Sequence, residues 1–522
     1  MNVELYDTTL RDGAQTQGIS FSVSDKIKIA EKLDTLGIHY IEGGWPGANP
    51  KDVTFFKKAK RMKFINSKLV AFGSTRRANA DVSKDATING LLRSGVENIT
   101  IFGKSWDLHV ETVLRTALDE NLKMIEESVK YLKSKGKFTI FDAEHFFDGY
   151  ADNPEYALKT LMAAESGGAD RIVLCDTNGG TLTAGIFEIV EAVRKKVRAP
   201  LGIHAHNDSD TAVANTIAAV QAGCIHVQGT INGYGERCGN ANLISIIGNL
   251  KLKLGVDCIQ DMRLKELTEA AHFIADMSNM KLADNQPFVG NSAFAHKAGV
   301  HVNAIIKNPR TYEHVEPSLV GNRRKLLISE LSGKSSILKK AGEIDLGLDK
   351  DAPKTKKILK ALQDLEHKGY HFESAEASLE LFMRRAAKGI KKFFDLKDFR
   401  VIVEKHSRGK ILSEATIKLK VNDKLEHTAS LGDGPVNALD NAIRKALMDF
   451  YPSLSEMHLT DFKVRVLDEK AGTAAKVRVL IQSQDKTDSW WTIGVSENII
   501  EASWYALVDS VEYKLLKDSK KS

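Results

Sequence analysis

The first half of the chain alternates short apolar runs with longer amphipathic segments, a pattern that predicts repeated βα units. The amphipathic segments have helix caps, such as the serine and glycine that bracket residues 22–37. Eight apolar runs are candidate strands: VELYDTTL, HYIEGG, KLVAFG, NITIFG, KFTIFDAEHF, RIVLCDT, PLGIHAHND and HVQGTING. Eight βα units predict an α/β fold, a closed (β/α)8 TIM barrel, with its active site where the carboxyl ends of the strands meet.

The pattern changes after residue 265. Residues 266–390 are lysine-rich and mostly helical, which is typical of an accessory and linker region. Residues 391–522 contain two pairs of candidate strands, DFRVIVEKH with SEATIKLKVN and LTDFKVRVLD with AAKVRVLIQS. Each pair is followed by a glycine turn and a helix, at GDGPVNALDNAI and TIGVSENIIEASWYAL. This repetition predicts an α+β domain with internal pseudo-twofold symmetry. We therefore expect a barrel at 1–265, a helical accessory region at 266–390 and an α+β domain at 391–522.

Composition narrows the class of partner. A net charge of +6 over 522 residues is too small to indicate nucleic acid or an anionic membrane, but it suits a small anionic substrate. The four cysteines have no CxxC spacing, which favours reduced thiols. No apolar run reaches the roughly 20 residues that span a bilayer, and the first segment is a predicted strand rather than a signal peptide. We expect a cytoplasmic protein.

The stretch GIHAHNDSD contains the clearest candidate chemistry. Residues two apart in a strand face the same side, so His204 and His206 are predicted to point together toward the barrel interior or its mouth. In a closed barrel, strands eight and one follow strand seven, which brings Asp12 and Asn240 to the same region. Two imidazoles, a carboxylate and an amide oxygen form a mixed ligand set without thiolate. Mn²⁺, Mg²⁺, Co²⁺ and Zn²⁺ all fit this set.

An arginine precedes the candidate carboxylate ligand. An isolated pair such as Arg11 and Asp12 is usually a structural ion pair, but the neighbouring ligand set favours a role in binding. A guanidinium grips a carboxylate through two parallel hydrogen bonds, while a metal ion polarises an adjacent carbonyl oxygen. A 2-oxo acid has both groups, and the hydroxyl of Thr177 is a further candidate donor to its carboxylate.

Three motifs resemble a known family. DTTLRDGAQTQG, HAHND and NGYGERCGNANL are similar to the signature of the 2-isopropylmalate, homocitrate and citramalate synthases, in the barrel superfamily that includes hydroxymethylglutaryl-CoA lyase. IEGGWPGANPKD and FDAEHFFDGY are most similar to the long citramalate synthases. The two glycine-turn motifs of the last domain resemble the amino-acid-sensing regulatory domain of 2-isopropylmalate synthases. The resemblance covers most of the chain.

The resemblance implies roles for individual residues. It makes Arg11 the oxo-acid arginine and Glu144 an active-site carboxylate, although Glu144 also suits an ordinary strand end. His301, in FAHKAGVHVNAI, matches a catalytic histidine that is delivered over the barrel mouth, with a partner subunit of a homodimer as a possible source. His296 competes for this role, and Tyr312 is either a substrate-site residue or a packing residue. The implied metal ligands are Asp12, His204, His206 and Asn240.

The implied reaction is a Claisen-type condensation of acetyl-CoA with pyruvate, followed by thioester hydrolysis to (R)-citramalate and CoA. This is the first step of a threonine-independent route to isoleucine, which makes isoleucine the expected effector at the glycine turns. Phe72 and Phe102 are candidates to fill the oxo-acid pocket. Three alternatives stay open: a 2-isopropylmalate or homocitrate synthase with a larger oxo acid, a lyase or carboxyltransferase on a related barrel, and a non-catalytic amino-acid sensor.

Overall fold

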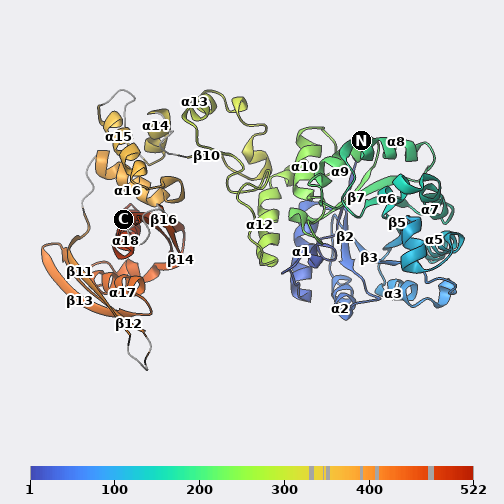
Figure 1. The fold of residues 1–522 in the computed structure, drawn as a ribbon, viewed down its shortest axis with the longest axis horizontal. Helices are drawn as coiled ribbons and strands as arrows, with labels where there is room; N and C mark the ends of the chain where they lie inside the picture. Colours follow the sequence, from blue (N-terminus) through green and yellow to red (C-terminus); the bar gives the residue numbers. More distant parts are fainter. Residues whose placement is uncertain are drawn as a thin grey trace. The chain divides into compact units, whose positions relative to one another are not determined.

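The computed structural model describes residues 2–327, 334–344, 346–347, 353–387, 392–405, 409, 411–467 and 475–520 (Figure 1). Parts of the predicted helical region, including residues 328–333 and 348–352, lie outside these ranges. The chain forms two compact units. The first consists of Met1–Phe294 and His314–Arg324, and the second of Ala295–Glu313 and Lys325–Ser522.

The first unit is built on a closed barrel of eight parallel strands in sequence order. The barrel closes because β1 pairs with both β2 and β8, with Tyr6 opposite Tyr40 on one side and Gln228 on the other. This confirms the predicted (β/α)8 fold. The strands are β1 Glu4–Asp7, β2 Tyr40–Gly44, β3 Lys68–Ser74, β4 Asn98–Lys104, β5 Phe138–Glu144, β6 Arg171–Asp176, β7 Leu201–Ala205 and β8 His226–Gly229.

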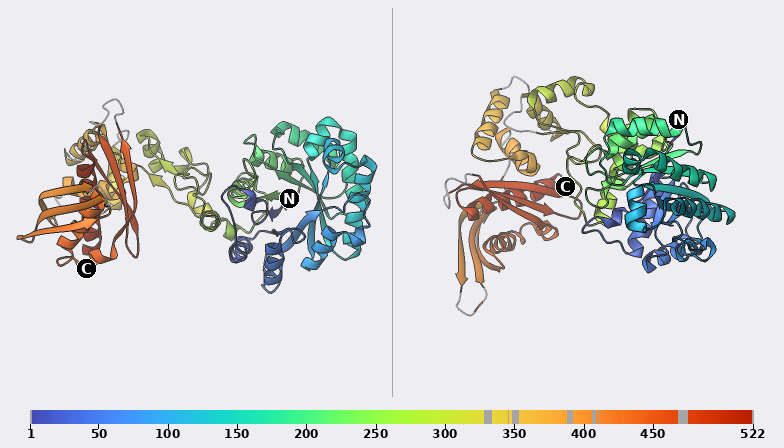
Figure 2. Two further views of the ribbon diagram at one scale, coloured as in Figure 1. Left: turned by 60° about the horizontal axis from the view of Figure 1, so that its bottom comes forward. Right: turned by 45° about the vertical axis from the view of Figure 1, so that its right-hand side comes forward.

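Helices cover the outside of the barrel (Figure 2). The first helix shows how local residues set where a helix begins and ends. Ser22 and Asp25 form a capping box at its start, and Gly37 ends it at a φ of 93°. The larger helices are α1 Val23–Leu36, α2 Pro50–Ala59, α3 Ala86–Ser94, α5 Leu118–Ser134, α7 Pro154–Ser166, α8 Thr183–Arg194, α9 Ala212–Gln221, α10 Leu243–Leu252 and α12 Leu267–Met277. Short helices are α4 Asp107–His109, α6 Phe146–Asp152 and α11 Asp261–Leu264.

The second unit begins with a helical segment. Its helices α15 and α16 share an apolar core with Ile493 and Val495 of the strand β16 (Ser489–Ser496), so they pack on the following sheet domain. The elements of this segment are β9 Ala295–His296, α13 Gly299–Lys307, β10 Lys325–Leu326, α14 Lys334–Glu343, α15 Pro353–His367 and α16 Glu376–Ala387.

Two antiparallel three-stranded sheets, each followed by a helix, form the rest of the second unit. This confirms the predicted α+β domain. Each half, however, has a third strand, β13 or β16, beyond the two predicted from sequence, and β13 was missed because no residue on it is fully buried. The elements are β11 Asp395–Lys405, β12 Ile411–Val421, β13 Lys424–Gly432, α17 Pro435–Leu447, β14 His458–Val466, β15 Val477–Gln484, β16 Ser489–Ser496 and α18 Ile499–Ser519.

Across the described ranges, every helix is too short or too polar to cross a bilayer.

The amino ends of the barrel strands are held by an ion pair. Glu4 of β1 accepts two hydrogen bonds of 2.9 Å from Arg171 of β6, and Nδ1 of His226 lies 3.4 Å from its Oε2. Burial raises the pKa of Glu4, but the hydrogen bonds from His226 and Arg171 lower it by more, to about 2. Glu4 therefore stabilises the barrel only while it is ionised.

We expect Glu4→Gln to lower the free energy of unfolding by about 2 kcal/mol at pH 7, with partial exposure of the pair taken into account. The pKa of Glu4 in the folded chain is below the unfolded value, so this contribution is complete above the unfolded pKa of 4.5 and is lost as the pH falls through 2. Urea unfolding should show that the difference in free energy of unfolding between wild type and Glu4→Gln is smaller at pH 3 than at pH 7. An equal difference at both pH values would contradict this, and Glu155→Gln, at an exposed pair with Lys159, is the control.

Candidate active site

A cavity of about 510 Å³ opens at the carboxyl ends of the barrel strands. Six polar residues predicted from sequence line it, and they lie at or just after the carboxyl ends of strands β1, β5, β6 and β7. They are Arg11, Asp12, Glu144, Thr177, His204 and His206. Barrel closure therefore brings most of the predicted site to one mouth.

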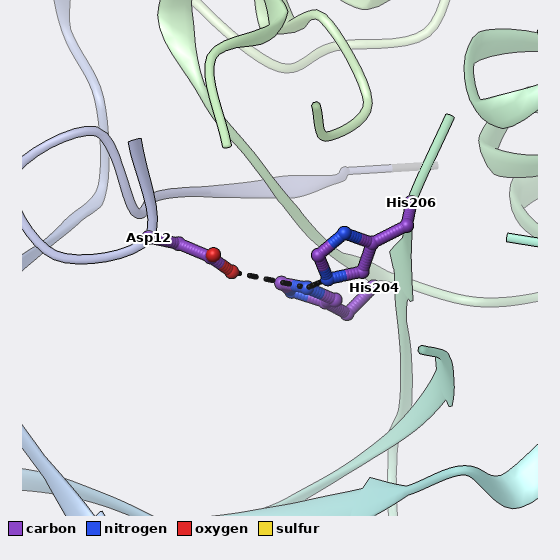
Figure 3. Close-up of side chains that lie close together, drawn as sticks. All are labelled: Asp12, His204 and His206. Atoms are coloured by element: carbon purple, nitrogen blue, oxygen red, sulfur yellow. Dashed lines mark hydrogen bonds and ion pairs between the residues drawn. The ribbon is translucent and has the colours of Figure 1, made fainter. Parts of the chain in front are cut away.

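Asp12, His204 and His206 form a buried cluster in this cavity (Figure 3). Nε2 of His204 lies 3.4 Å from Nε2 of His206 and 3.5 Å from Oδ2 of Asp12. One ligand atom from each residue falls within 4.8 Å of the other two. His204 belongs to β7, whereas His206 lies one residue beyond its end, yet both imidazoles face the same space. Two imidazole nitrogens and a carboxylate oxygen at these separations fit a single divalent ion.

Asn240 lies next to His206 on the glycine-rich loop after β8 but is not among the residues that line the cavity. It forms a backbone bridge with His206 and is 2% exposed. Gly235 allows this approach, since a Cβ there would lie 2.1 Å from Nδ2 of Asn240, and Gly239 adopts a φ of 90°. Nδ2 of Asn240 donates to the carbonyl of Tyr234, whereas its Oδ1 is buried without a hydrogen-bond partner among the described residues. An orphaned amide oxygen beside this cluster fits a fourth metal ligand.

Electrostatics keep the cluster in a ligand-competent form. Burial raises the pKa of Asp12, but the charge of Arg11 and the two imidazoles lower it by more. Burial lowers the pKa of His204, and burial together with His204 lowers the pKa of His206 to about 4. At neutral pH the carboxylate is therefore ionised and both imidazoles are neutral, so each has a lone pair for a cation.

Gln228 orients one of the imidazoles. Its Oε1 lies 2.9 Å from Nδ1 of His204, and its Nε2 donates to Oδ1 of Asp142 at 3.0 Å. Because Oε1 is an acceptor, Nδ1 of His204 carries the proton and Nε2 presents its lone pair to the cavity. Sequence reasoning missed this residue. The available signal was a glutamine in the middle of a strand, HVQG, that is buried throughout.

Arg11 is held in place by a carboxylate from the next strand. Its Nε pairs with Oε1 of Glu42, while Tyr6 donates to Oε2 of Glu42 at 2.6 Å. The guanidinium lies 3.7 Å from the ring centroid of Phe72, and its Nη2 is 3.6 Å from Oδ2 of Asp12. Glu42 was also missed, although a glutamate inside a fully buried strand is itself a signal. The arrangement fixes the guanidinium beside the Asp12 cluster.

Glu144 and Thr177 both line the cavity, as expected for strand-end residues. Glu144 forms a close ion pair with Lys104 of the neighbouring strand β4. Oγ1 of Thr177 accepts a hydrogen bond of 2.8 Å from the backbone N–H of His145. The hydroxyl proton of Thr177 therefore stays available for a ligand in the cavity.

The other predicted residues lie in the second unit. His301 and Tyr312 stack with ring centroids 4.1 Å apart, and both are exposed. His296 lies 3.3 Å from Oε1 of Glu313 through its Nε2. His301 and Tyr312 thus form a pair of their own, whereas His296 is engaged with a carboxylate.

Comparisons with known proteins match the chain from end to end. The model of the HMGL-like family matches residues 2–274, that of the homocitrate synthase post-HMGL domain 288–369, and that of the LeuA allosteric (dimerisation) domain 373–515. The (R)-citramalate synthase of Aquifex aeolicus is 58% identical over 99% of this chain and 98% of its own, and that of Geobacter sulfurreducens is 57% identical over the same shares. The chain belongs to the citramalate synthase family.

The family membership confirms the enzyme class that the sequence predicts. Like its family, this chain is a condensing transferase rather than a binding protein with a degenerate barrel. The 2-isopropylmalate synthase of Methanocaldococcus jannaschii is a more distant relative, 29% identical over 99% of this chain and 96% of its own. The two bacterial (R)-citramalate synthases named above are thus about twice as identical to this chain as that enzyme, whereas the (R)-citramalate synthase of Methanocaldococcus jannaschii is 30% identical.

We expect Gln228→Met to weaken Mn²⁺ binding by about 10- to 100-fold, because the imidazole of His204 loses the acceptor that fixes its tautomer. Chelator-treated protein should be titrated with Mn²⁺ and followed by calorimetry and by the rise in melting temperature. Gln260→Met, at an exposed position, is the control. Wild-type affinity in Gln228→Met would show that Gln228 does not position the ligand.

Proposed function

We propose that this chain is a citramalate synthase that condenses acetyl-CoA with pyruvate and hydrolyses the thioester to (R)-citramalate and CoA. One observation carries the proposal: Arg11 and the Asp12, His204 and His206 cluster share one cavity, with Nη2 of Arg11 3.6 Å from Asp12. A carboxylate-binding group next to a cation site matches a 2-oxo acid, in which carboxylate and ketone are adjacent.

In this proposal, Arg11 binds the pyruvate carboxylate through the edge of the guanidinium that Glu42 leaves open. Thr177 donates its hydroxyl proton to the same carboxylate. Asp12, His204, His206 and Asn240 hold a divalent metal ion, which supplies Lewis-acid polarisation of the ketone when bound. The donor set suits Mn²⁺, Mg²⁺, Co²⁺ or Zn²⁺, and we propose one of these as the native ion.

Three aromatic rings in the cavity support pyruvate over larger oxo acids. Phe72 stacks on Phe102 with centroids 5.5 Å apart, and Trp45 packs edge-on against both at 6.0 and 5.7 Å. Phe72 lies against the Arg11 guanidinium, and we propose that this cluster fills the space that a longer substrate side chain would need. Packed rings exclude a larger oxo acid by steric clash. An open apolar pocket would instead distinguish substrates that differ by one methyl group by only about 1–3 kcal/mol of binding free energy.

The proton chemistry requires a base at the methyl group of acetyl-CoA. We assign Glu144 to the active site, where the ion pair with Lys104 keeps its carboxylate positioned at the cavity. We assign His301 to proton transfer, with the stacked ring of Tyr312 fixing its imidazole. The enol formed at the methyl carbon attacks the ketone carbon, and water then cleaves the thioester to release CoA.

The proposed activity also suggests an effector, an oligomeric state and a cellular compartment for this chain. Citramalate leads toward isoleucine, so we propose isoleucine as a feedback effector at the C-terminal domain. The match to the LeuA dimerisation domain supports a homodimer. Four cysteines without disulfides among the described residues fit a reducing compartment, the cytoplasm.

Release of free CoA from acetyl-CoA tests the proposal, with pyruvate, 2-oxoisovalerate and 2-oxoglutarate offered in parallel after chelation and again with added Mn²⁺. We expect metal-dependent release with pyruvate at least tenfold faster than with either larger acid. His204→Ala should lower the rate by more than 100-fold, because it removes a ligand. Faster release with a larger acid would change the substrate, and no release with any acid would leave a lyase as the better assignment.

We expect His301→Ala to lower kcat by about 10²- to 10⁴-fold with little change in the KM for pyruvate, since proton transfer rather than oxo-acid binding is lost. Steady-state kinetics of His296→Ala provide the matched comparison, because His296 lies in the same segment but is engaged with Glu313. A larger loss of kcat in His296→Ala than in His301→Ala would reverse the assignment.

A further inference from the structure

A buried ion pair lies in the wall of the cavity at the barrel mouth and has no part in the proposed reaction. Lys26 of α1 and Asp52 of α2 both line this cavity, and each is 4% exposed. Nζ of Lys26 donates to Oδ1 of Asp52 at 2.5 Å. Removing two charges from water costs free energy that their mutual attraction often does not return. The stability of the fold alone is therefore a weak reason for the pair.

The pair binds the backbone at an irregular end of strand β2. The register between β2 and β3 shifts at Gly43, so the regular ladder is interrupted there. Nζ of Lys26 also donates to the carbonyl of Gly43 at 3.1 Å. Oδ2 of Asp52 accepts from the backbone N–H of Trp45 at 2.9 Å. The two ions thus hold the chain on both sides of an irregularity, the kind of feature that redirects a side chain.

A glycine allows this close approach. Gly44 has a φ of 132°, and a Cβ at this position would lie 2.3 Å from Oδ2 of Asp52. This backbone conformation favours glycine, and the carboxylate occupies the space that a side chain would need. Asp52 contacts Lys26 through one oxygen and the chain just after Gly44 through the other. The carboxylate therefore links helix α1 to the loop that follows β2.

The residue that Asp52 holds contributes a ring to the aromatic cluster of the cavity. Trp45 packs edge-on against Phe72 and Phe102. Those two rings belong to β3 and β4, whose paired backbones fix their positions. Trp45 lies one residue beyond β2, and its carbonyl accepts from Ala48 and Asn49 of its own loop. Its placement against the two other rings therefore relies on the bond to the ion pair.

We propose that the Lys26–Asp52 pair sets the width of the oxo-acid pocket by positioning Trp45. This inference rests on the proposed function, in which three aromatic rings exclude oxo acids larger than pyruvate. Neither ion touches the reacting atoms, so both are positioning residues. Breaking the pair releases the loop after β2, and the ring of Trp45 then moves away from the two phenylalanines. The space that opens admits a longer substrate side chain.

A role in binding an anionic substrate group fits the pair less well. Lys26 uses two of its three ammonium hydrogens for Asp52 and Gly43. The charge of Asp52 also cancels that of Lys26, so the pair as a whole has no net attraction for an anion. If the pair bound acetyl-CoA, its loss would raise the KM for acetyl-CoA without changing the preference among oxo acids.

The first test compares kcat/KM for pyruvate and for 2-oxobutyrate, which is one methylene longer, in the full-length enzyme with Mn²⁺. The double variant Lys26→Met/Asp52→Leu removes both charges without leaving one unpaired. We expect its kcat/KM for 2-oxobutyrate to rise and its preference for pyruvate to fall by about tenfold or more. A merely destabilised enzyme would lose activity with both acids. Asp52→Asn, which keeps the size of the side chain, gives the same comparison if the double variant does not fold.

Asp170 provides a matched control at the amino ends of the barrel strands. Its carboxylate accepts from Nζ of Lys133 at 2.6 Å and from the backbone N–H of Thr139 at 2.7 Å, the same pattern that Asp52 forms. We expect Asp170→Asn to keep the wild-type preference between the two acids. Trp45→Ala should lower this preference, and adding the double variant to Trp45→Ala should lower it no further, because the two changes act through one ring.

Fluorine NMR follows the ring independently of the reaction. In protein labelled with 5-fluorotryptophan, the signal that is lost in Trp45→Phe identifies Trp45. We expect this signal to shift in the double variant and to keep its position in Asp170→Asn.

Three results would overturn the inference: an unmoved Trp45 signal in the double variant, an unchanged preference between the two acids, or a rise in the KM for acetyl-CoA alone. A wild-type enzyme that prefers a larger oxo acid would instead overturn the proposed function. The Trp45 signal would still decide whether the ion pair positions the ring, so the two failures are distinguishable.

Discussion

Pairing between the first and last strands of the barrel is the constraint on which the site depends. β1 and β8 are adjacent only because the sheet closes, and their register sets Asp7 opposite Gly229. The chain leaves both strands just beyond this point, which brings Asp12 next to the loop that carries Asn240. Without closure, Asp12 and the histidines of β7 would lie at opposite edges of an open sheet. The geometry of the candidate metal cluster is therefore a property of the whole barrel rather than of any one motif.

Charge is balanced locally inside this mouth. Arg11 and Glu42 are buried together, and Glu42 also accepts from Tyr6, so neither ion is left without partners. Breaking such a pair leaves an unpaired charge in a medium of low dielectric, which costs far more than the pair contributes. The same arrangement suits the role proposed for Arg11, because a guanidinium that is already desolvated and oriented loses little freedom when it meets a carboxylate. In that proposal, structural stability and substrate affinity depend on the same two side chains.

Much of this arrangement can be predicted from sequence. The eight strands follow from short apolar runs between amphipathic segments, and the convergence of Asp12, His204 and His206 follows from strand order once a closed barrel is assumed. The hydrogen-bond partners of these side chains are harder to predict, because Gln228 contacts His204 across 24 positions and Glu42 contacts Arg11 across 31 positions. The third strands, β13 and β16, were not predicted, for different reasons: β13 is largely solvent-facing, whereas the residues TIGVS of β16 were interpreted as a glycine turn before the helix. The location of His301 relative to the barrel depends on how two units assemble, which no local pattern encodes.

Barrel closure also has a consequence in time. The hydroxyl of Thr8 donates to the carbonyl of Gly229, 221 residues later, so the first strand is synthesised long before its second neighbour exists. Until β8 emerges from the ribosome, β1 has an unpaired edge and Tyr6 has no complete interior to pack in. Contacts of such sequence separation form slowly, because the entropy of a long loop is lost before any bond is gained. The Asp12, His204 and His206 cluster is thus among the last features of the barrel to form, and an ion bound there would report that the barrel has closed.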